Sequence, residues 1–208
     1  MLAASLVVAT IAAPRSRSAI AARRAQPRLE PVHLLHPERS ACEGFIAARF
    51  QRAHGARIGH FSPHLLGVRD ALGRWRAASG YTPAGGRRLF LEQYLDAPVE
   101  RALSQHRGRA ISRDGIVEVG NLAASSIGMA RALIPLLARH LDRLGYEWVV
   151  FTATRELRNT FARLGLHPVA LAPADPARLH ERGDWGRYYD NDPVVMAGRI
   201  SHAVHGRA

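Results

Sequence analysis

The clearest hydrophobic pattern of the chain lies in its second half. Residues 116–123 (IVEVGNLA) form an apolar run interrupted by two polar residues, which is typical of a buried strand. From about Ser126 the apolar residues recur at helical spacing, and Gly145 follows as the residue that can end the helix. The pattern predicts a strand, a turn of small residues and a long amphipathic helix.

The rest of the chain from Pro31 divides into further strands and helices. Early hairpin strands followed by a β-α-β-α-β half indicate an α/β (α+β) fold, with a mixed, mostly antiparallel sheet and helices on both faces. Pro98 is expected to kink or divide one predicted helix. The predicted helices cover residues 37–54, 89–103, 126–144 and 156–164, and the predicted strands cover residues 32–35, 64–69, 74–81, 116–123, 148–153, 168–171 and 194–200.

These elements predict a single domain over residues 31–201, between a disordered basic leader at residues 1–30 and a disordered tail at residues 202–208. The leader contains the apolar run Leu2–Ala13, which at 12 residues is shorter than the roughly 20 that span a bilayer. A secretory signal would have basic residues before such a run, and none is present. We therefore expect a cytoplasmic protein, with secretion as the alternative.

Charge and cysteine content limit which binding partners, metal sites and enzyme classes can be expected. The formal net charge is +12, and all 29 basic residues are Arg. Excess Arg attracts phosphates and acidic proteins, whereas nucleic acid is not an expected partner because no known binding module is recognised. The single Cys42 excludes an internal disulfide and a cysteine zinc site, and the histidines match no metal motif. We therefore expect no metal. A serine lipase is disfavoured because the G-x-S-x-G motif is missing.

Four strings of the sequence resemble the bacterial thermostable hemolysin family, and the likeness extends over about residues 32–200. That family is similar in turn to the GNAT acyltransferase fold and to the acyl-homoserine-lactone synthases, which move a fatty acyl chain from an acyl carrier protein to an amine. The family name records lysis of red cells and leaves the mechanism open. The strings are FLEQYLDAPVE (90–100), IVEVGNLA (116–123), FTATRELRNTFARLGL (151–166) and WGRYYDNDPVVMAG (185–198).

The GNAT resemblance implies a donor site at the start of the helix that follows residue 123. In that fold the pattern Gln/Arg-x-x-Gly-x-Gly/Ala binds the pyrophosphate of coenzyme A; here Ser125 takes the Gln/Arg position, while Gly128 and Ala130 match. A helix N-terminus can hold an anion through its unpaired N–H groups and partial positive charge. The implied donor is acyl-CoA or the phosphopantetheine of an acyl carrier protein. Its candidate contacts are Ser125, Ser126, Ile127, Gly128, Met129 and Ala130.

The same resemblance implies one pantetheine contact and reveals a missing acid. Asn159 matches an Asn that contacts the pantetheine arm in GNAT enzymes, with an exposed helix residue as the alternative. Many of those enzymes use a Tyr four residues before the glycine that ends this helix to protonate the leaving thiolate. Phe161 occupies that position here and cannot donate a proton. Tyr188 or Tyr189 is the substitute acid or part of an aromatic core.

Glu118 and Asn121 are the candidate catalytic residues. The acyl-homoserine-lactone synthases carry Glu-x-Ser/Thr-Arg-Phe on the equivalent strand, and this chain keeps only the Glu, so lactone formation is not expected. Transfer to an amine needs a base, and burial of Glu118 in an apolar strand would raise its pKa toward a useful range. The alternative is a structural carboxylate paired with an Arg. Asn121 either orients the thioester carbonyl or pairs with a strand edge.

The expected function is transfer of a fatty acyl group from acyl carrier protein or CoA to a small amine acceptor. The Arg excess would then attract an acidic carrier protein or the donor's phosphates. The alternative is a hemolysin that damages membranes directly without enzymatic activity, and membrane contact is compatible with both functions. A membrane-damaging protein should offer an amphipathic segment of membrane length outside the core, and only the leader run lies outside it.

Overall fold

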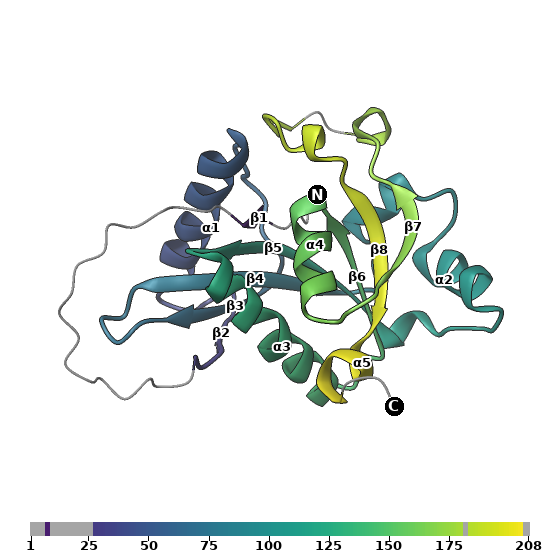
Figure 1. Cartoon of the computed structure of the whole chain (residues 1–208), viewed down its shortest axis with the longest axis horizontal. Helices are drawn as coiled ribbons and strands as arrows, with labels where there is room; N and C mark the ends of the chain where they lie inside the picture. The colour runs from purple at the N-terminus through teal and green to yellow at the C-terminus, as the bar shows by residue number, and fades with distance from the viewer. Residues whose placement is uncertain (1–6, 9–26, 181–182, 206–208) are drawn as a thin grey trace.

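The centre of the molecule is a sheet of eight strands with helices on both faces (Figure 1). The structure is a computed structural model that describes residues 7–8, 27–180 and 183–205. Along the main path of seven strands, neighbours run antiparallel except for β5 and β6. The eighth strand, β1 (Val7–Val8), pairs in parallel with β5, and the whole confirms the predicted mixed, mostly antiparallel α/β (α+β) arrangement. In spatial order the strands are β2 (Glu30–Val32), β3 (His64–Arg69), β4 (Trp75–Pro83), β5 (Ile116–Ala124), β6 (Trp148–Ala153), β8 (Val194–Arg199) and β7 (Val169–Pro173).

The helices on the two faces bury separate apolar clusters against the sheet. On one face α3 (Ile127–Arg143), α4 (Arg155–Arg163) and α5 (Ile200–His205) pack into the largest cluster. On the opposite face α1 (Arg39–His54) covers the β2 side of the sheet. There the 3₁₀ segment η1 (Phe90–Tyr94) and α2 (Val99–Arg107) cover the β6–β7 side.

The long helix α3 follows from its caps and its apolar stripe. The side chain of Ser126 accepts a hydrogen bond from Met129 N at 3.2 Å and so caps the first turn. Gly145 has a φ of +85°, the left-handed conformation that ends many helices. Between these ends, one face of the helix is buried against the sheet, which fixes the turn between β5 and α3. Its buried residues are Ala130, Leu133, Ile134, Leu137, Ala138 and Leu141.

The strands β5 and β6 pair over only a short distance. Their parallel ladder runs from Ile116 to Glu118 on β5 and goes no further. Beyond it β5 contains an irregularity, because its register with β4 shifts between Ala78 and Gly80 and Asn121 has a φ of +51°. A bulge of this kind bends a strand and increases its twist. The two parallel strands therefore separate where the candidate catalytic residues lie.

Two segment predictions differ from the structure, and the expected effect of Pro98 is confirmed. The predicted strand at residues 32–35 instead lies at Glu30–Val32, because the chain turns after Val32, where His36 N bonds to His33 O at 3.0 Å. Pro98 divides the predicted helix 89–103 into η1 and α2. The predicted tail at residues 202–208 overlaps α5, which buried Ile200 holds against the core.

The leader predicted at residues 1–30 lies mostly outside the described residues. Within it the structure describes a two-residue strand, β1 (Val7–Val8), which pairs in parallel with Ala123 and Ala124 of β5. At its other end Glu30 already belongs to β2. These residues are therefore in strands, and the remainder of the leader stays a prediction.

Candidate functional site

Glu118 is a buried carboxylate at the end of the β5–β6 ladder. Only 2% of it is exposed, and it lies on the face that η1 and α2 cover. Its Oε2 accepts a hydrogen bond from Phe90 N at 2.8 Å and its Oε1 one from Leu91 N at 3.2 Å. Burial raises the pKa of Glu118 to about 8, and the negative charge of Glu92 adds to the rise, although the two amides oppose it. A carboxyl group with this pKa can exchange a proton near neutral pH.

The predicted alternative, a structural pair between Glu118 and an Arg, is not what the structure shows. Among the described residues, Glu118 forms no salt bridge, and its hydrogen bonds come from the backbone of η1. The carboxylate therefore does hold η1 in place, through amides rather than a guanidinium. A base and an anchor for η1 are compatible roles for one carboxyl group.

The 3₁₀ segment η1 is fixed by a second buried carboxylate, which sequence reasoning missed. Glu92 accepts hydrogen bonds from Leu89 N at 2.7 Å and Val99 N at 2.8 Å. Arg113 Nη1 lies 2.7 Å from Glu92 Oε1 and 2.6 Å from Glu100 Oε2. This network joins η1 to α2 and keeps the two amides that bind Glu118 in position. The only sequence signal for this network is Arg113 itself, in the loop between α2 and β5. Sequence spacing does not identify the carboxylates that Arg113 binds.

An aromatic cluster lies beside η1, and it contains both tyrosines that were candidates for the acid. The hydroxyls of Tyr94 and Tyr189 are 2.7 Å apart, whereas Tyr188 is fully buried. The rings of Phe90 and Tyr189 lie 6.1 Å from that of Trp185. Burial raises the pKa of Tyr189 to about 12, so its phenol keeps its proton at neutral pH. Tyr94 lies within the predicted helix 89–103 and was not among the candidates for the acid.

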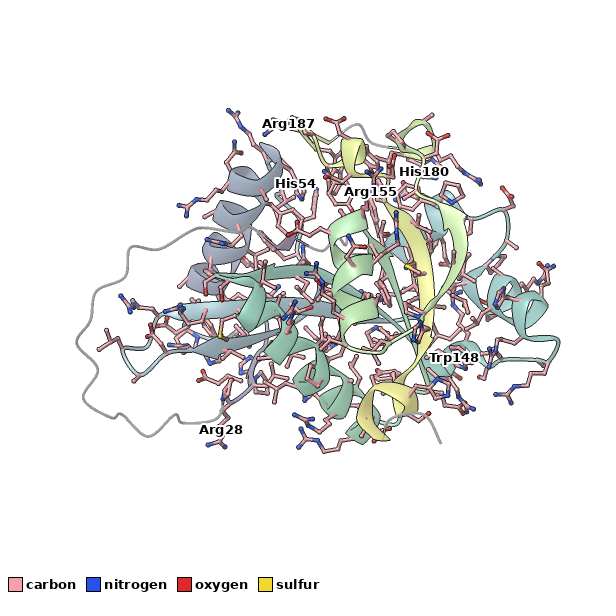
Figure 2. All side chains as sticks on the ribbon, in the orientation of Figure 1. Arg28, His54, Trp148, Arg155, His180 and Arg187 are labelled. Carbon is pink, nitrogen blue, oxygen red and sulfur yellow. The ribbon has the colours of Figure 1, made fainter. Side chains whose placement is uncertain are left out.

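The loop that carries this cluster is attached to the end of α1. Arg187 N donates to His54 O at 2.7 Å, and the two residues lie at the same end of the molecule (Figure 2). Gly186 has a φ of +50°, and a Cβ atom there would clash with the His54 carbonyl. Only glycine fits this approach. The loop therefore spans the sheet face from β8 to α1.

The side chain of Asn121 is hydrogen-bonded to a neighbouring loop. Its Oδ1 accepts hydrogen bonds from Ser62 N at 2.9 Å and Ser62 Oγ at 3.1 Å, and its Nδ2 donates to His60 O at 3.4 Å. These partners lie in a loop rather than on the predicted strand edge, and the orienting of a thioester carbonyl by Asn121 stays a prediction. Asn121 holds the irregular part of β5 in its left-handed conformation.

The residues predicted to contact the donor lie at the start of α3 and differ in how accessible they are. Ser125 N donates to Arg76 O at 2.8 Å, and Arg76 Nε donates to Ser125 Oγ at 3.1 Å. A Cβ atom at Gly128 would meet only Ser126 Oγ, at 3.9 Å, so space remains above the helix N-terminus. Ala130 is fully buried in the core and cannot contact a ligand, contrary to the prediction. Ile127 and Met129 are partly buried against the same core.

Arg76 is a cation at this position that the sequence pattern did not suggest. It lies on β4, far from the turn in sequence, and its Nη1 is 3.4 Å from Asp70 Oδ2. Ser125 lacks the long polar side chain of the GNAT pattern, and the guanidinium of Arg76 bonds to its hydroxyl instead. The strand register, rather than a local motif, brings the two residues together.

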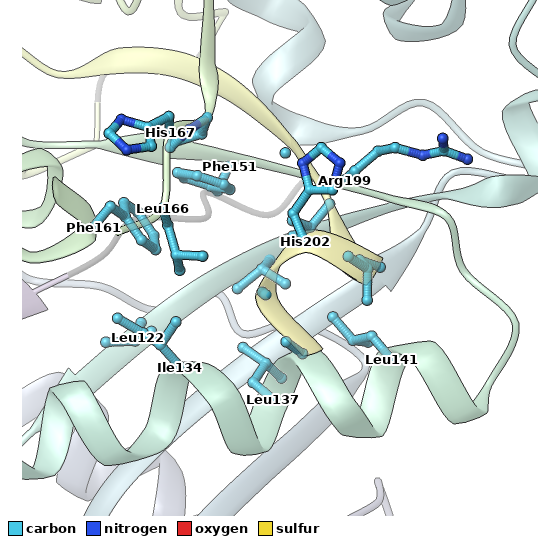
Figure 3. Close-up of a pocket in the computed structure, with 17 residues that line it drawn as sticks. Leu122, Ile134, Leu137, Leu141, Phe151, Phe161, Leu166, His167, Arg199 and His202 are labelled. Carbon is cyan, nitrogen blue, oxygen red and sulfur yellow. The ribbon is translucent and has the colours of Figure 1, made fainter. Parts of the chain in front are cut away.

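Asn159 and Phe161 lie on α4 with different surroundings. Asn159 is exposed in the middle of the helix. Phe161 is buried, with its ring 5.0 Å from that of Phe151, so it is an apolar core residue and no acid. Both phenylalanines line a cavity of about 90 Å³ on the α3 face of the sheet (Figure 3). Its other apolar walls include Val119, Leu122, Ile134, Leu137, Leu141 and Leu166.

The cavity and Glu118 lie on opposite faces of β5. Val119 and Leu122 line the cavity, whereas Glu118 faces η1. The ladder between β5 and β6 ends at Glu118, so the separation of these strands lies between the carboxylate and the cavity.

Within the described ranges, no three His, Cys, Asp or Glu side chains gather as a metal site would require. No helix in that part of the chain is long and apolar enough to cross a membrane.

The model of the thermostable hemolysin family matches residues 32–204. The chain belongs to the thermostable hemolysin family. This confirms the resemblance inferred from the four sequence strings. A search of the curated proteins found no match.

Solved structures with similar folds are acyl-transferring proteins by their names. The N-acyl amino acid synthase FeeM from uncultured soil microbes has a TM-score of 0.58 and 14% identity, over 85% of this chain and 93% of that one. The CoA-dependent acyl-homoserine lactone synthase MesI has a TM-score of 0.50 and 16% identity, over 86% and 92%. A putative N-acetyltransferase from Lactobacillus plantarum has a TM-score of 0.52 and 11% identity, over 83% and 98%. At these identities the likeness establishes a GNAT-like fold.

Proposed function

We propose that this protein is an acyltransferase that moves a fatty acyl group from a CoA or acyl-carrier-protein thioester to a small amine. The observation that carries the proposal is Glu118, a buried carboxyl group with a pKa of about 8 at the point where β5 and β6 separate. The fold shared with FeeM and MesI supports the reaction class.

In the proposed reaction the amine nitrogen attacks the thioester carbonyl. A C–N bond forms, the C–S bond breaks, and Glu118 accepts the proton that the amine loses. The leaving thiolate needs no strong acid, since a thiol has a pKa of about 8.5. The proton that Glu118 takes from the amine is proposed to pass to the thiolate, and the paired hydroxyls of Tyr94 and Tyr189 are proposed to hydrogen-bond the sulfur as it leaves.

The donor is proposed to lie along β5, with its phosphates at the N-terminus of α3. The free space above Gly128 and the guanidinium of Arg76 support this placement. The apolar cavity lined by Leu122 and Phe151 would take the start of the acyl chain. At about 90 Å³ the cavity is smaller than the usual few hundred Å³ of a ligand pocket, so a long chain requires it to widen.

The test is thiol release from acyl-CoA and acyl carrier protein thioesters, measured with a series of small amines. Wild type should release thiol only when an amine acceptor is present, and mass spectrometry should find the N-acylated product. Glu147→Gln, which changes an exposed carboxylate, serves as the matched control for Glu118→Gln. Leakage of pure lipid vesicles by the protein, with no thioester consumed or bound, would instead support a hemolysin that acts directly on membranes.

A further inference from the structure

The backbone of β5 has two edges near its end, and they have different partners. At Ala123 and Ala124 one edge pairs with Ala78 and Ala77 of β4. The opposite edge faces β6, but β6 stops pairing at Glu118. The stretch from residue 119 to 124 therefore presents an edge that β6 does not cover.

The two-residue strand β1 occupies the end of that edge. Val7 pairs with Ala123 and Val8 with Ala124, both in parallel. Because β4 already holds the other edge at these residues, β1 must lie on the β6 side. Its contacts with α4, the helix that follows β6, agree with this position. Val7 and Val8 are thus inserted where β5 and β6 separate.

The same edge is the path that the proposed donor would follow. A donor with its thioester at Glu118 and its phosphates at Ser126 must run along residues 119–124, a distance of about 20 Å at the rise of roughly 3.3 Å per strand residue. The pantetheine arm between thioester and phosphate is an extended chain with two amides. Extended amide chains add to open strand edges through backbone hydrogen bonds.

From this overlap we infer that β1 and the acyl thioester compete for the open edge of β5, so that β1 inhibits its own protein. The inference rests on the proposed function for its ligand. A β5 residue has one set of backbone groups on this edge, so only one of the two strands can pair there. Displacement of β1 is then a step in donor binding.

Proline substitution in the full-length protein tests the competition. Proline lacks a backbone N–H and cannot donate to the ladder, so the double variant Val7→Pro/Val8→Pro should release β1. If β1 is paired about nine-tenths of the time, the KM for the acyl thioester should fall about tenfold, with kcat unchanged. Ile20→Pro is the control, because it introduces a proline without changing either paired residue. A non-reactive acyl thioether of CoA gives the donor Kd directly by calorimetry.

A peptide provides the converse measurement. A synthetic peptide of residues 4–17 should inhibit the double variant competitively with the donor, whereas the same peptide with prolines at positions 7 and 8 should not. Equal donor Kd values for wild type, the double variant and Ile20→Pro would overturn the competition and leave the proposed function standing. Absence of both turnover and thioether binding in all three proteins would overturn the proposed function and this inference with it.

Discussion

Glu92 and Glu118 are two buried carboxylates on the same face of the sheet, yet their environments differ. Each accepts hydrogen bonds from two backbone amides in or beside η1, and they are 5% and 2% exposed. Arg113 also binds Glu92, whereas Glu118 has no cationic partner in the described part of the chain. Burial by itself acts to raise the pKa of both carboxyl groups. For Glu92 the hydrogen bonds from Arg113 and the two amides outweigh burial, so the pKa of Glu92 is lower than usual.

The difference shows how one guanidinium separates a structural group from a reactive one. A carboxylate held charged by an arginine is a poor proton acceptor, because its pKa falls. A carboxyl group that is equally buried but lacks that partner has its pKa near 8 and can gain and lose a proton under mild conditions. The comparison predicts that changes at Glu118 affect turnover and that changes around Glu92 affect stability.

The largest expected effect is the loss of turnover in Glu118→Gln. Glutamine has the size of the neutral acid but cannot accept a proton, and general-base catalysis contributes about 100- to 10,000-fold. Thiol release from the acyl thioester should fall by at least about 100-fold, while the circular dichroism spectrum stays that of wild type. Unchanged turnover would remove Glu118 as the base.

The next effect is a loss of stability in Arg113→Met. The change leaves Glu92 buried without its cation, which costs about 3 kcal/mol of unfolding free energy or more. Urea denaturation measures this cost. The matched control Arg74→Met removes an exposed ion pair with Asp70 and should cost less than about 1 kcal/mol. Equal losses in the two variants would contradict the contrast between buried and exposed pairs.

The two carboxylates should give the unfolding free energy opposite dependences on pH. The folded-state pKa of Glu118 is above its unfolded value, so its contribution is full below the unfolded pKa and is lost as pH rises through about 8. The pKa of Glu92 is lowered, so its contribution is present above the unfolded pKa and is lost as pH falls through the folded value.

Denaturation of wild type, Glu118→Gln and Glu92→Gln between pH 3 and 9 separates these contributions. Relative to Glu118→Gln, wild type should lose stability toward pH 9. Relative to Glu92→Gln, it should lose stability toward pH 3. A wild-type difference from Glu118→Gln that does not change with pH would show that the pKa of Glu118 is not raised.

The smallest expected effect concerns Arg76. Arg76 would attract the donor's phosphates, and a partly exposed pair of opposite charges contributes up to about 1 kcal/mol, so Arg76→Gln should raise the KM for acyl-CoA by up to about fivefold. Added salt should reduce the difference between wild type and the variant. Arg74→Gln is the control, because Arg74 lies just before β4 and pairs with Asp70. An equal rise of KM in both variants would point to general charge rather than a donor contact.

The sequence predicts the fold well where hydrophobic patterns are strong. The strand 116–124 and the helix after it follow directly from apolar spacing and caps, and the short edge strand at 30–32 was misplaced because so few residues carry its pattern. The prominence of Glu118 was also visible, since it interrupts an apolar run. Contacts between distant segments were not visible: Arg76 with Ser125, Asn121 with Ser62 and Tyr94 with Tyr189 all depend on register and loop paths.

The most direct test of the account is the pH dependence of kcat/KM for acyl transfer to an amine with a pKa below 6, so that the acceptor does not titrate in the range studied. With Glu118 as the base, the rate of wild type should rise with pH to a plateau, with a midpoint near 8. Glu92→Gln should keep a titration but at a lower midpoint, because the charge of Glu92 adds to the raised pKa of Glu118, whereas Glu118→Gln should lose the titration. A wild-type rate that stays constant between pH 6 and 9 would contradict the central role of Glu118.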